Sequence, residues 1–142
     1  MPVTDDDELV ELLDLRTVAV VGCSTSEGKP AHDVPAYLLE HGYRIVPINP
    51  FADEIFDRTA YDSLSTVPGT IEIDIVEVFR PSEEAPDIVD EAIERHEKDG
   101  NISAVWLQLG IRHEEAATRA ETAGLRFVQD RCMKVEHERL MR

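Results

Sequence analysis

A loop with the residue types of an anion site follows the first apolar run of the chain. The stretch VAVVGCSTSEGKPAHD, residues 18–33, passes from apolar residues through Gly22 to three hydroxyl residues and then to Lys29. A glycine permits a tight turn after a strand, and a helix that starts near Asp33 would direct backbone amides and a partial positive charge at the loop. Lys29 adds a full charge. These residues predict binding of a ligand that carries phosphates.

The two best-known phosphate-loop patterns do not fit this loop. A Walker A loop has four residues between its glycines and then Gly-Lys-Ser/Thr, whereas five residues separate Gly22 from Gly28 and Pro30 takes the place of the hydroxyl residue. In the dinucleotide pattern, Ser24 replaces the second glycine. The next apolar run ends in Asn49-Pro50, where an acid should accept hydrogen bonds from a ribose. A P-loop nucleotidase and an ordinary NAD site are both disfavoured.

Two arginines support an anion site near Lys29. Arg80 and Arg112 each come just after a predicted strand. Because the carboxyl ends of parallel strands share one edge of the sheet, all three bases are expected along one rim. Each base taken singly is equally well explained as a solvated surface residue, and that alternative stays open. Their convergence in an acidic chain favours a ligand with several phosphates.

The residues that most often act in catalysis or bind metal show no matching pattern. Cys23 and Cys132 fit no zinc spacing, and a structural disulfide is not expected. Cys132 lies near Arg131 and Lys134, which would lower the pKa of its thiol, although a buried inert thiol is the favoured alternative. The five histidines are scattered, and His137 lacks the i, i+4 partner of a helical metal site. We therefore predict no catalytic residue and no metal ligand.

The chain is strongly acidic. It has 30 acidic against 14 basic residues, for a net charge of −16, and only three of the bases are lysine. Such a charge disfavours nucleic acid and anionic membranes as partners. The acids are spread over every segment, which favours a solvated surface adapted to a salt-rich cytoplasm, because concentrated salt screens their repulsion. An acidic face for a protein partner is the alternative.

Length and hydropathy indicate a soluble cytoplasmic protein. The 142 residues suit a single domain, and the N-terminus lacks the features of a signal peptide. No apolar run approaches the roughly 18 residues that span a bilayer. Within one domain over 1–142, we expect an N-terminal helix in 1–16, a core in 17–130 and a C-terminal helix in 131–142.

Apolar runs alternate with amphipathic stretches along the chain. Strands are predicted at 17–21, 44–48, 74–79, 103–107 and 127–128. Helices are predicted at 4–14, 33–41, 83–98, 113–123 and 135–141, with Thr4 and Ser82 as N-caps. This alternation predicts an α/β fold, a doubly wound Rossmann-like parallel sheet of about five strands with helices on both faces. Ligands of such sheets bind beyond the carboxyl ends of the strands.

With these loops placed, the chain resembles the small stand-alone CoA-binding proteins. This Rossmann-like family is related to the CoA-binding domain of the succinyl-CoA synthetase alpha subunit. The resemblance runs from about residue 17 to residue 140. It rests on the stretches VAVVGCSTSEGKPAHDVPAYLLEHGYRIVPINP, YDSL, DIVEVFRPSE, VWLQLGIRHEEAATRAETAGLRFVQDRC and KVEH.

The resemblance implies that CoA lies across the strand ends. The implied cofactor-binding residues are Gly22, Cys23, Ser24, Lys29, Pro47, Asn49, Pro50, Phe79, Arg80, Gln108 and Gly110. We interpret Lys29 as a phosphate contact, Pro50 as packing on the adenine or ribose, and Arg80 as a second anion contact. The chain departs from the family pattern at Cys23, where a small apolar residue is usual, and at Lys29, where arginine is common. The lysine keeps the charge without bidentate phosphate binding.

The position of Cys23 near a thiol cofactor raises a further hypothesis, a reversible mixed disulfide between CoA and Cys23 or Cys132. The leading functional prediction is a non-catalytic protein that binds CoA or acyl-CoA as a carrier, sensor or subunit. One alternative is a component of an acyl-CoA ligase, which would need a partner chain because the grasp domain and phosphohistidine segment of those ligases are absent. The other is an NAD-linked redox sensor. Expected partners are an acyl-CoA enzyme or a second copy of the chain.

Overall fold

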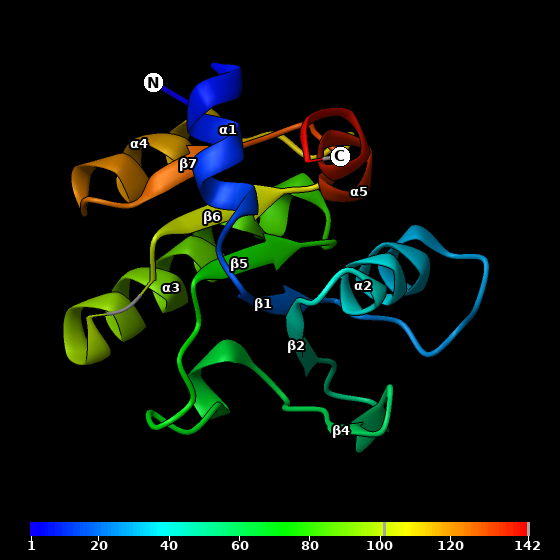
Figure 1. Cartoon of the computed structure of the whole chain (residues 1–142). Coiled ribbons are helices and arrows are strands. Elements are labelled where there is room, and N and C mark those ends of the chain that lie inside the picture. The colour runs from blue at the N-terminus through cyan, green and yellow to red at the C-terminus, as the bar shows by residue number, and fades with distance from the viewer. Residues whose placement is uncertain (101, 142) are drawn as a thin grey trace.

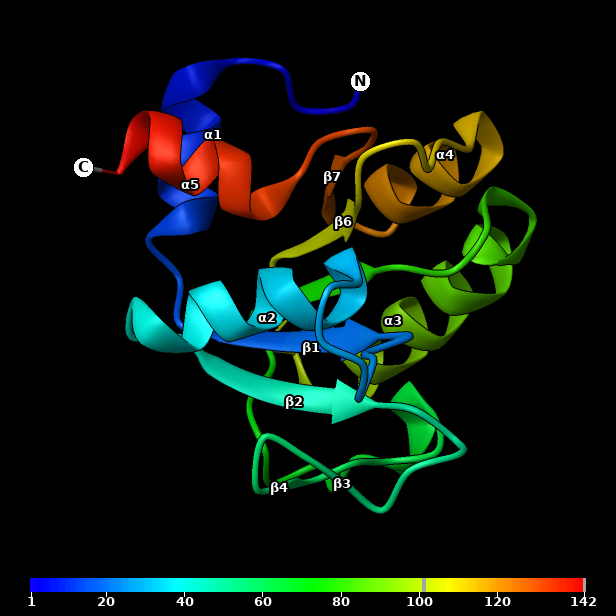
Figure 2. The same ribbon diagram turned by 90° about the vertical axis from the view of Figure 1, so that its right-hand side faces the viewer.

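A five-stranded parallel sheet forms the centre of the computed structural model, which describes residues 1–100 and 102–141. The strands lie in the order β2-β1-β5-β6-β7. Figure 1 shows them with the helices around them, and Figure 2 shows β1 and β2 side by side under α2. Their bounds are β1 (Thr17–Val21), β2 (Arg44–Ile48), β5 (Ile75–Val78), β6 (Ala104–Leu107) and β7 (Arg126–Val128). The predicted doubly wound α/β fold is confirmed.

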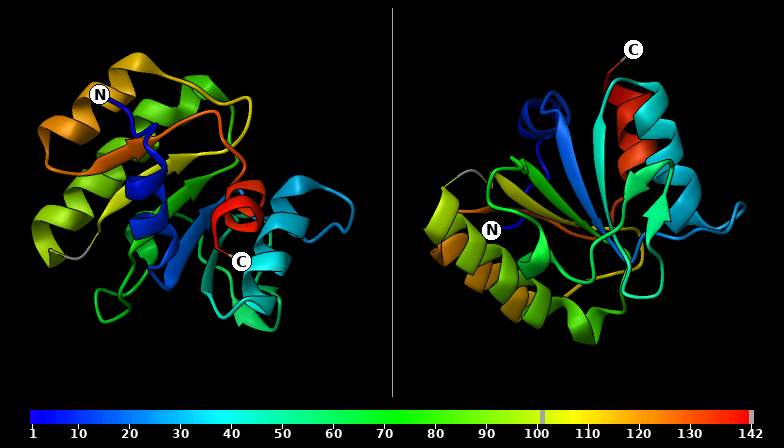
Figure 3. Two further views of the ribbon diagram at one scale, coloured as in Figure 1. Left: turned by 45° about the horizontal axis from the view of Figure 1, so that its top comes forward. Right: turned by 90° about the horizontal axis from the view of Figure 1, so that it is seen from below.

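Five α-helices cover the two faces of the sheet. They are α1 (Asp6–Leu13), α2 (Pro30–Glu40), α3 (Ala85–Asp99), α4 (Glu114–Thr122) and α5 (Met133–Leu140). In the right-hand view of Figure 3, α3 and α4 lie on one side of the sheet, and α1, α2 and α5 lie on the other. The chain changes face between β1 and β5, because the crossover from β1 leads outward to β2 and the next strand returns to the other side of β1. Ligand sites of such folds lie at this switch point.

The strands are apolar throughout because both faces are buried. Val18 and Val20 pack on the side of α1, α2 and α5, whereas Ala19 packs on the side of α3 and α4. Trp106 is fully buried on the first of these sides. Two hydrophobic cores, one on each face, thus hold the carboxyl ends of the strands in one row.

The two predicted N-caps, Thr4 and Ser82, do not cap the helices that follow them. Asp5, not Thr4, caps α1, because the Asp5 carboxylate accepts a hydrogen bond from the Glu8 amide at 3.3 Å. Ser82 begins a short 3₁₀ turn, η2 (Ser82–Glu84), and α3 follows from Ala85. The Ser82 hydroxyl instead accepts from the amide of Arg112 at 3.1 Å, so it joins the loops after β5 and β6.

The segment between β2 and β5 contains elements that the sequence pattern did not predict. They are a two-stranded hairpin, β3 (Glu54–Ile55) with β4 (Arg58–Thr59), and a 3₁₀ turn, η1 (Leu64–Thr66). The hairpin turn places Phe56 and Asp57 at φ values of 58° and 59°. Turns of this kind usually carry Asn-Gly, and Phe56-Asp57 lacks that turn signal. Among the described residues, no helix is long and apolar enough to cross a membrane.

Candidate ligand-binding cleft

A cavity of about 460 Å³ opens at the switch point, beyond the carboxyl ends of β1, β2 and β5. Its volume lies in the range of small-molecule sites. Its wall on the α3 side continues through η1 and the first turns of α3. The lining residues are Val21, Gly22, Ile48, Asn49, Pro50, Phe51, Asp62, Ser63, Leu64, Arg80, Glu84, Ile88 and Glu91. Four of the predicted site residues thus meet in this cleft: Gly22, Asn49, Pro50 and Arg80.

Gly22 is needed for the close approach of Arg80 to the end of β1. Gly22 has a φ of 87°, and a Cβ atom on it would lie 3.0 Å from Cδ of Arg80. The Arg80 guanidinium donates to both carboxylate oxygens of Glu84, with Nε–Oε1 at 3.1 Å and Nη2–Oε2 at 2.9 Å. This pair raises the pKa of Arg80 above its usual value. The predicted anion contact is therefore already neutralised by a carboxylate.

Asn49 joins the loops that follow β1 and β2. Its side-chain amide donates to the backbone carbonyl of Cys23 at 2.9 Å, and its Oδ1 accepts from the backbone amide of Phe51 at 2.8 Å. Phe51 is 95% exposed and lies at the rim of the cavity. With both ends of its amide engaged, Asn49 acts as a clamp that sets the position of Pro50 and Phe51.

The loop between β1 and α2 is fixed by groups at the start of α2. Pro35 lies inside α2 and has no amide, so the Ala31 carbonyl is left without its helical partner. That carbonyl accepts from the amide of Ser24 at 3.0 Å. The carboxylate of Asp33 accepts from the amide of Gly28 at 3.1 Å. Contacts within about ten residues of sequence therefore shape the part of this loop that follows Cys23.

The same loop retains free donors. Among the described residues, the amides of Thr25 and Glu27 have no hydrogen-bond partner and Lys29 has no ion pair. Lys29 is exposed at the N-cap position of α2. Free amides, a helix N-terminus and an unpaired ammonium group are the features that bind phosphate in proteins. Ser24 is two residues beyond Gly22, which lines the cavity, but neither Ser24 nor Lys29 is among the lining residues.

The thiol of Cys23 does not reach the cleft. Cys23 is fully buried in the core on the α2 side, and burial raises the pKa of its thiol to about 12. A buried, protonated thiol is a poor nucleophile for disulfide exchange. This burial contradicts the hypothesis of a mixed disulfide between CoA and Cys23. The hypothesis for Cys132, which is half-buried, stays a prediction.

A fully buried carboxyl group lies beside this thiol. Glu77 pairs in register with Val20 and Trp106, and both of those residues face α2 and α5. Neither oxygen of the Glu77 carboxyl group has a hydrogen-bond partner among the described residues. Burial raises the pKa of Glu77 to about 8, so at neutral pH it holds its proton. Sequence inspection missed this group because it occupies one position of an otherwise apolar strand.

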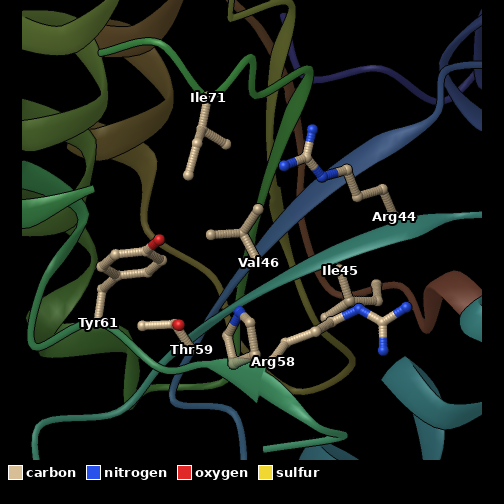
Figure 4. Close-up of a pocket in the computed structure, with 8 residues that line it drawn as sticks. Arg44, Ile45, Val46, Arg58, Thr59, Tyr61 and Ile71 are labelled. Atoms are coloured by element: carbon tan, nitrogen blue, oxygen red, sulfur yellow. The ribbon is translucent and has the colours of Figure 1, made fainter. Parts of the chain in front are cut away.

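Two other predicted residues lie away from the switch point. Pro47 is buried in β2 and lines a separate cavity of about 210 Å³ at the outer edge of the sheet, shown in Figure 4. There the Arg44 and Arg58 side chains lie on opposite sides of the β2 ribbon and do not converge on a common point. Phe79 is half-buried and packs against the core on the α2 side. Neither residue lines the switch-point cavity.

The residues of the loop after β6 make hydrogen bonds within the protein. Gln108 is buried, and its Oε1 accepts from the Met133 amide at 3.3 Å at the start of α5. The Gly110 amide donates to Asp130 at 2.7 Å. Arg112 pairs with the same carboxylate at 3.4 Å and lines a different cavity. The expected convergence of three bases is thus only partial.

Several cleft residues were missed by the sequence analysis. Phe51 follows Asn49-Pro50 directly, and its apolar character at the end of a strand was the available signal. Glu84, Ile88 and Glu91 lie at helical spacing after Arg80, so one face of α3 was readable from the pattern. Asp62 comes from the irregular segment before η1, which no periodicity places.

Comparisons with known proteins agree with this geometry. The chain is 35% identical to YneT, an uncharacterized protein of Bacillus subtilis, over 131 residues that make up 92% of each chain. A solved structure from Thermus thermophilus superposes with a TM-score of 0.87 at 40% identity, covering 96% of this chain and 99% of that one. These relatives share the whole fold with the chain.

A third relative connects the chain with CoA chemistry. Over 109 residues it is 30% identical to acetate–CoA ligase [ADP-forming] II of Archaeoglobus fulgidus. The match covers 75% of this chain and only 15% of the ligase. The shared part therefore corresponds to one domain of that larger protein. Residues 16–138 match the family model described as the CoA binding domain, and the chain belongs to this CoA-binding domain family.

Proposed function

We propose that this protein binds CoA or an acyl-CoA at the carboxyl edge of the sheet and does not itself catalyse a reaction. The observation that carries the proposal is the loop that runs from Gly22 at the switch point to α2, because Lys29 and the amides of Thr25 and Glu27 in this loop have no partner among the described residues. The diphosphate of CoA would lie on these donors, with Ser24 supplying a hydroxyl. The roles we propose are those of a carrier, a sensor or a subunit in a salt-rich cytoplasm.

The NAD alternative is disfavoured by the geometry of Asn49. An NAD site needs an acid at the end of the second strand to accept from the ribose. Asn49 stands there, and both ends of its side-chain amide are already bound to the backbone. Asn49 therefore lacks the carboxylate that pairs with the ribose hydroxyls in an NAD site.

The ligase alternative is supported by the match to the Archaeoglobus fulgidus enzyme. Since the chain spans 15% of that enzyme, the ligase reaction would require further chains. We propose such a chain, or a second copy of this one, as a partner. An assay of ATP formation from acetyl-CoA, ADP and phosphate tests this alternative: we expect no turnover by the isolated protein, and turnover would establish catalysis.

Thermal unfolding in molar KCl tests the binding proposal directly. CoA, acetyl-CoA, NAD, NADP and ATP are compared at matched concentrations. A ligand present at a hundredfold excess over its Kd stabilises the native state by about 2.7 kcal/mol. We expect CoA or acetyl-CoA to raise the melting temperature and NAD to leave it unchanged. Stabilisation by NAD without any effect of CoA would overturn the proposal.

A further inference from the structure

Two histidines from different helices line one cavity away from the cleft. The helices α2 and α5 lie against each other on one face of the sheet (Figure 3). His41 is the C-cap of α2, His137 lies in the last turn of α5, and both line a cavity of about 360 Å³. Their ring centres are 5.1 Å apart. Because they are far apart in sequence, no spacing within one helix could reveal this pair of imidazoles.

Tyr37 holds one nitrogen of each imidazole ring. Nδ1 of His41 donates to the backbone carbonyl of Tyr37 at 2.8 Å, and Nδ1 of His137 lies 2.7 Å from the Tyr37 hydroxyl, which can accept its proton. Among the described residues, neither Nε2 atom has a hydrogen-bond partner. Metal-binding histidines have this arrangement, in which a hydrogen bond to one ring nitrogen fixes the tautomer and leaves the other nitrogen for the metal.

The separation of the two rings fits a shared metal ion. Two imidazoles that bind a tetrahedral zinc ion, each with a Zn–N distance of about 2.0–2.1 Å, have their ring centres about 5 Å apart. The described residues contain no cluster of three or more His, Cys, Asp or Glu side chains that would complete a metal centre. Water must therefore fill the other positions, which makes the site an open one from which the ion can exchange.

The charges around the cavity are mixed. Glu138 lines it, and the net charge of the chain is −16, so a cation is attracted to this surface. The Lys134 ammonium group lies 5.5 Å from the centre of the Tyr37 ring and opposes a second cation. The imidazole nitrogens, and not the overall charge, must consequently supply the specificity, and imidazole suits zinc, copper and nickel better than magnesium or calcium.

We propose that His41 and His137 bind one divalent transition-metal ion, such as Zn²⁺, through their Nε2 atoms, and that this ion joins the end of α2 to α5. The site is independent of the proposed function. Lys29 is the N-cap of α2 and His41 is its C-cap, so the two proposed sites lie at opposite ends of the helix.

Calorimetric titration of the whole chain with ZnCl₂ in molar KCl, without CoA, tests the metal site. The concentrated salt screens weak binding of zinc to surface carboxylates. We expect one zinc ion per chain, and a Kd that rises about tenfold or more in His41→Gln and in His137→Gln, because each variant loses one of the two protein ligands. His41 is exposed, so its replacement does not endanger folding. His113→Ser, which replaces one good N-cap residue of α4 by another, is the matched control.

Two further measurements separate the imidazole pair from other zinc ligands. Cys132→Ser removes the half-buried thiol and should bind zinc like the wild type. Saturating zinc should raise the melting temperature of the wild type and of His113→Ser, and leave that of His41→Gln unchanged. Equal zinc affinity in the wild type and both histidine variants would overturn the proposal, as would loss of binding in Cys132→Ser. If the wild type binds no zinc, the proposal is wrong, whereas the CoA titrations remain unaffected.

Discussion

The two walls of the cleft differ in charge and in construction. On the β1 side Gly22 lines the cavity, and the loop that continues from it carries Lys29, free amides and the N-terminus of α2 outside the cavity lining. The opposite wall, formed by η1 and α3, offers carboxylates and an arginine that is already paired. Phe51 stands between them. A symmetrical anion site would be basic on both sides, so the proposed phosphate contacts are confined to the loop after β1.

The walls also differ in how they are held. The loop wall is shaped by contacts close in sequence, such as the bond from Ser24 to the Ala31 carbonyl. The α3 wall is assembled from three segments that meet only in the folded chain. Asn49 connects the loops that follow β1 and β2, because its side chain is hydrogen-bonded to Cys23 in one loop and to Phe51 in the other.

The largest effect on stability is expected at Glu77, the buried carboxyl group near Cys23. Its pKa is raised from 4.5 to about 8, so the native state keeps a proton that the unfolded state loses between those pH values. The stability conferred by the protonated form is complete below the unfolded pKa and is lost as pH rises through 8. Glutamine has no proton to lose in this pH range, so the Glu77→Gln variant does not show this loss of stability. We expect its stability relative to the wild type to grow by about 3 kcal/mol between acidic and alkaline pH.

Urea unfolding of both proteins, near pH 5 and near pH 9 at constant KCl concentration, measures this difference. Glu72→Gln, a change at an exposed glutamate close by in sequence, is the control and should follow the wild-type curve. Parallel pH profiles for wild type and Glu77→Gln would show that Glu77 is not the titrating group. If Glu77→Gln also binds CoA with the wild-type affinity, Glu77 affects the stability of the protein and not the binding of the ligand.

Breaking the clamp between the walls should have the next largest effect. Asn49→Ala removes both hydrogen bonds and leaves the Cys23 carbonyl without this donor. We expect a loss of stability of about 1–2 kcal/mol and weaker CoA binding, measured by urea unfolding and calorimetry. Asn49→Asp keeps the acceptor for the Phe51 amide but loses the donor. Its stability and its affinity for CoA should therefore fall between those of the wild type and those of Asn49→Ala. Unchanged binding in Asn49→Ala would mean that the walls act independently.

Removing the charge of the loop wall should weaken binding without affecting the fold. For Lys29→Ala we expect the Kd of CoA to rise about tenfold, because a charge-assisted contact to phosphate is lost. Stability should stay within about 0.5 kcal/mol, as is usual for exposed positions. Lys98→Ala, at another exposed lysine, provides the control. If both variants bind CoA like the wild type, Lys29 does not contact the ligand.

The smallest effect is expected at the ion pair of the α3 wall. Glu84→Gln releases Arg80 and removes one carboxylate from the cavity. The affinity for CoA should increase about twofold, while the loss of an i, i+4 pair costs roughly 0.3 kcal/mol of stability. Titration calorimetry and urea unfolding measure the two quantities. A weaker affinity for CoA would show that the pair positions Arg80 for the ligand and does not merely occupy it.

Local sequence signals were sufficient for most of the elements. β1 and β2 start and end at the predicted residues, because apolar runs bounded by glycine and proline leave little choice. Helix starts were less certain: α2 begins at Pro30, before the predicted residue 33, since proline is well suited to the first helical turn. The hairpin at Phe56-Asp57 escaped prediction because Phe56 does not favour a positive φ and the turn has no glycine.

Of the candidate site, the sequence by itself determined the loop after β1. Ser24 and Lys29 are close in sequence, and the contacts that shape their part of the loop are local, whereas the start of the loop is bonded to β2, where the Ile48 carbonyl accepts from the Gly22 amide. Only the tertiary structure decided the rest. It turned the Cys23 thiol into the core, paired Arg80 with Glu84, and brought Asp62 and Glu91 to the same cavity. Sequence patterns report the face of a strand or helix, whereas burial and charge pairing depend on which distant segments pack against that face.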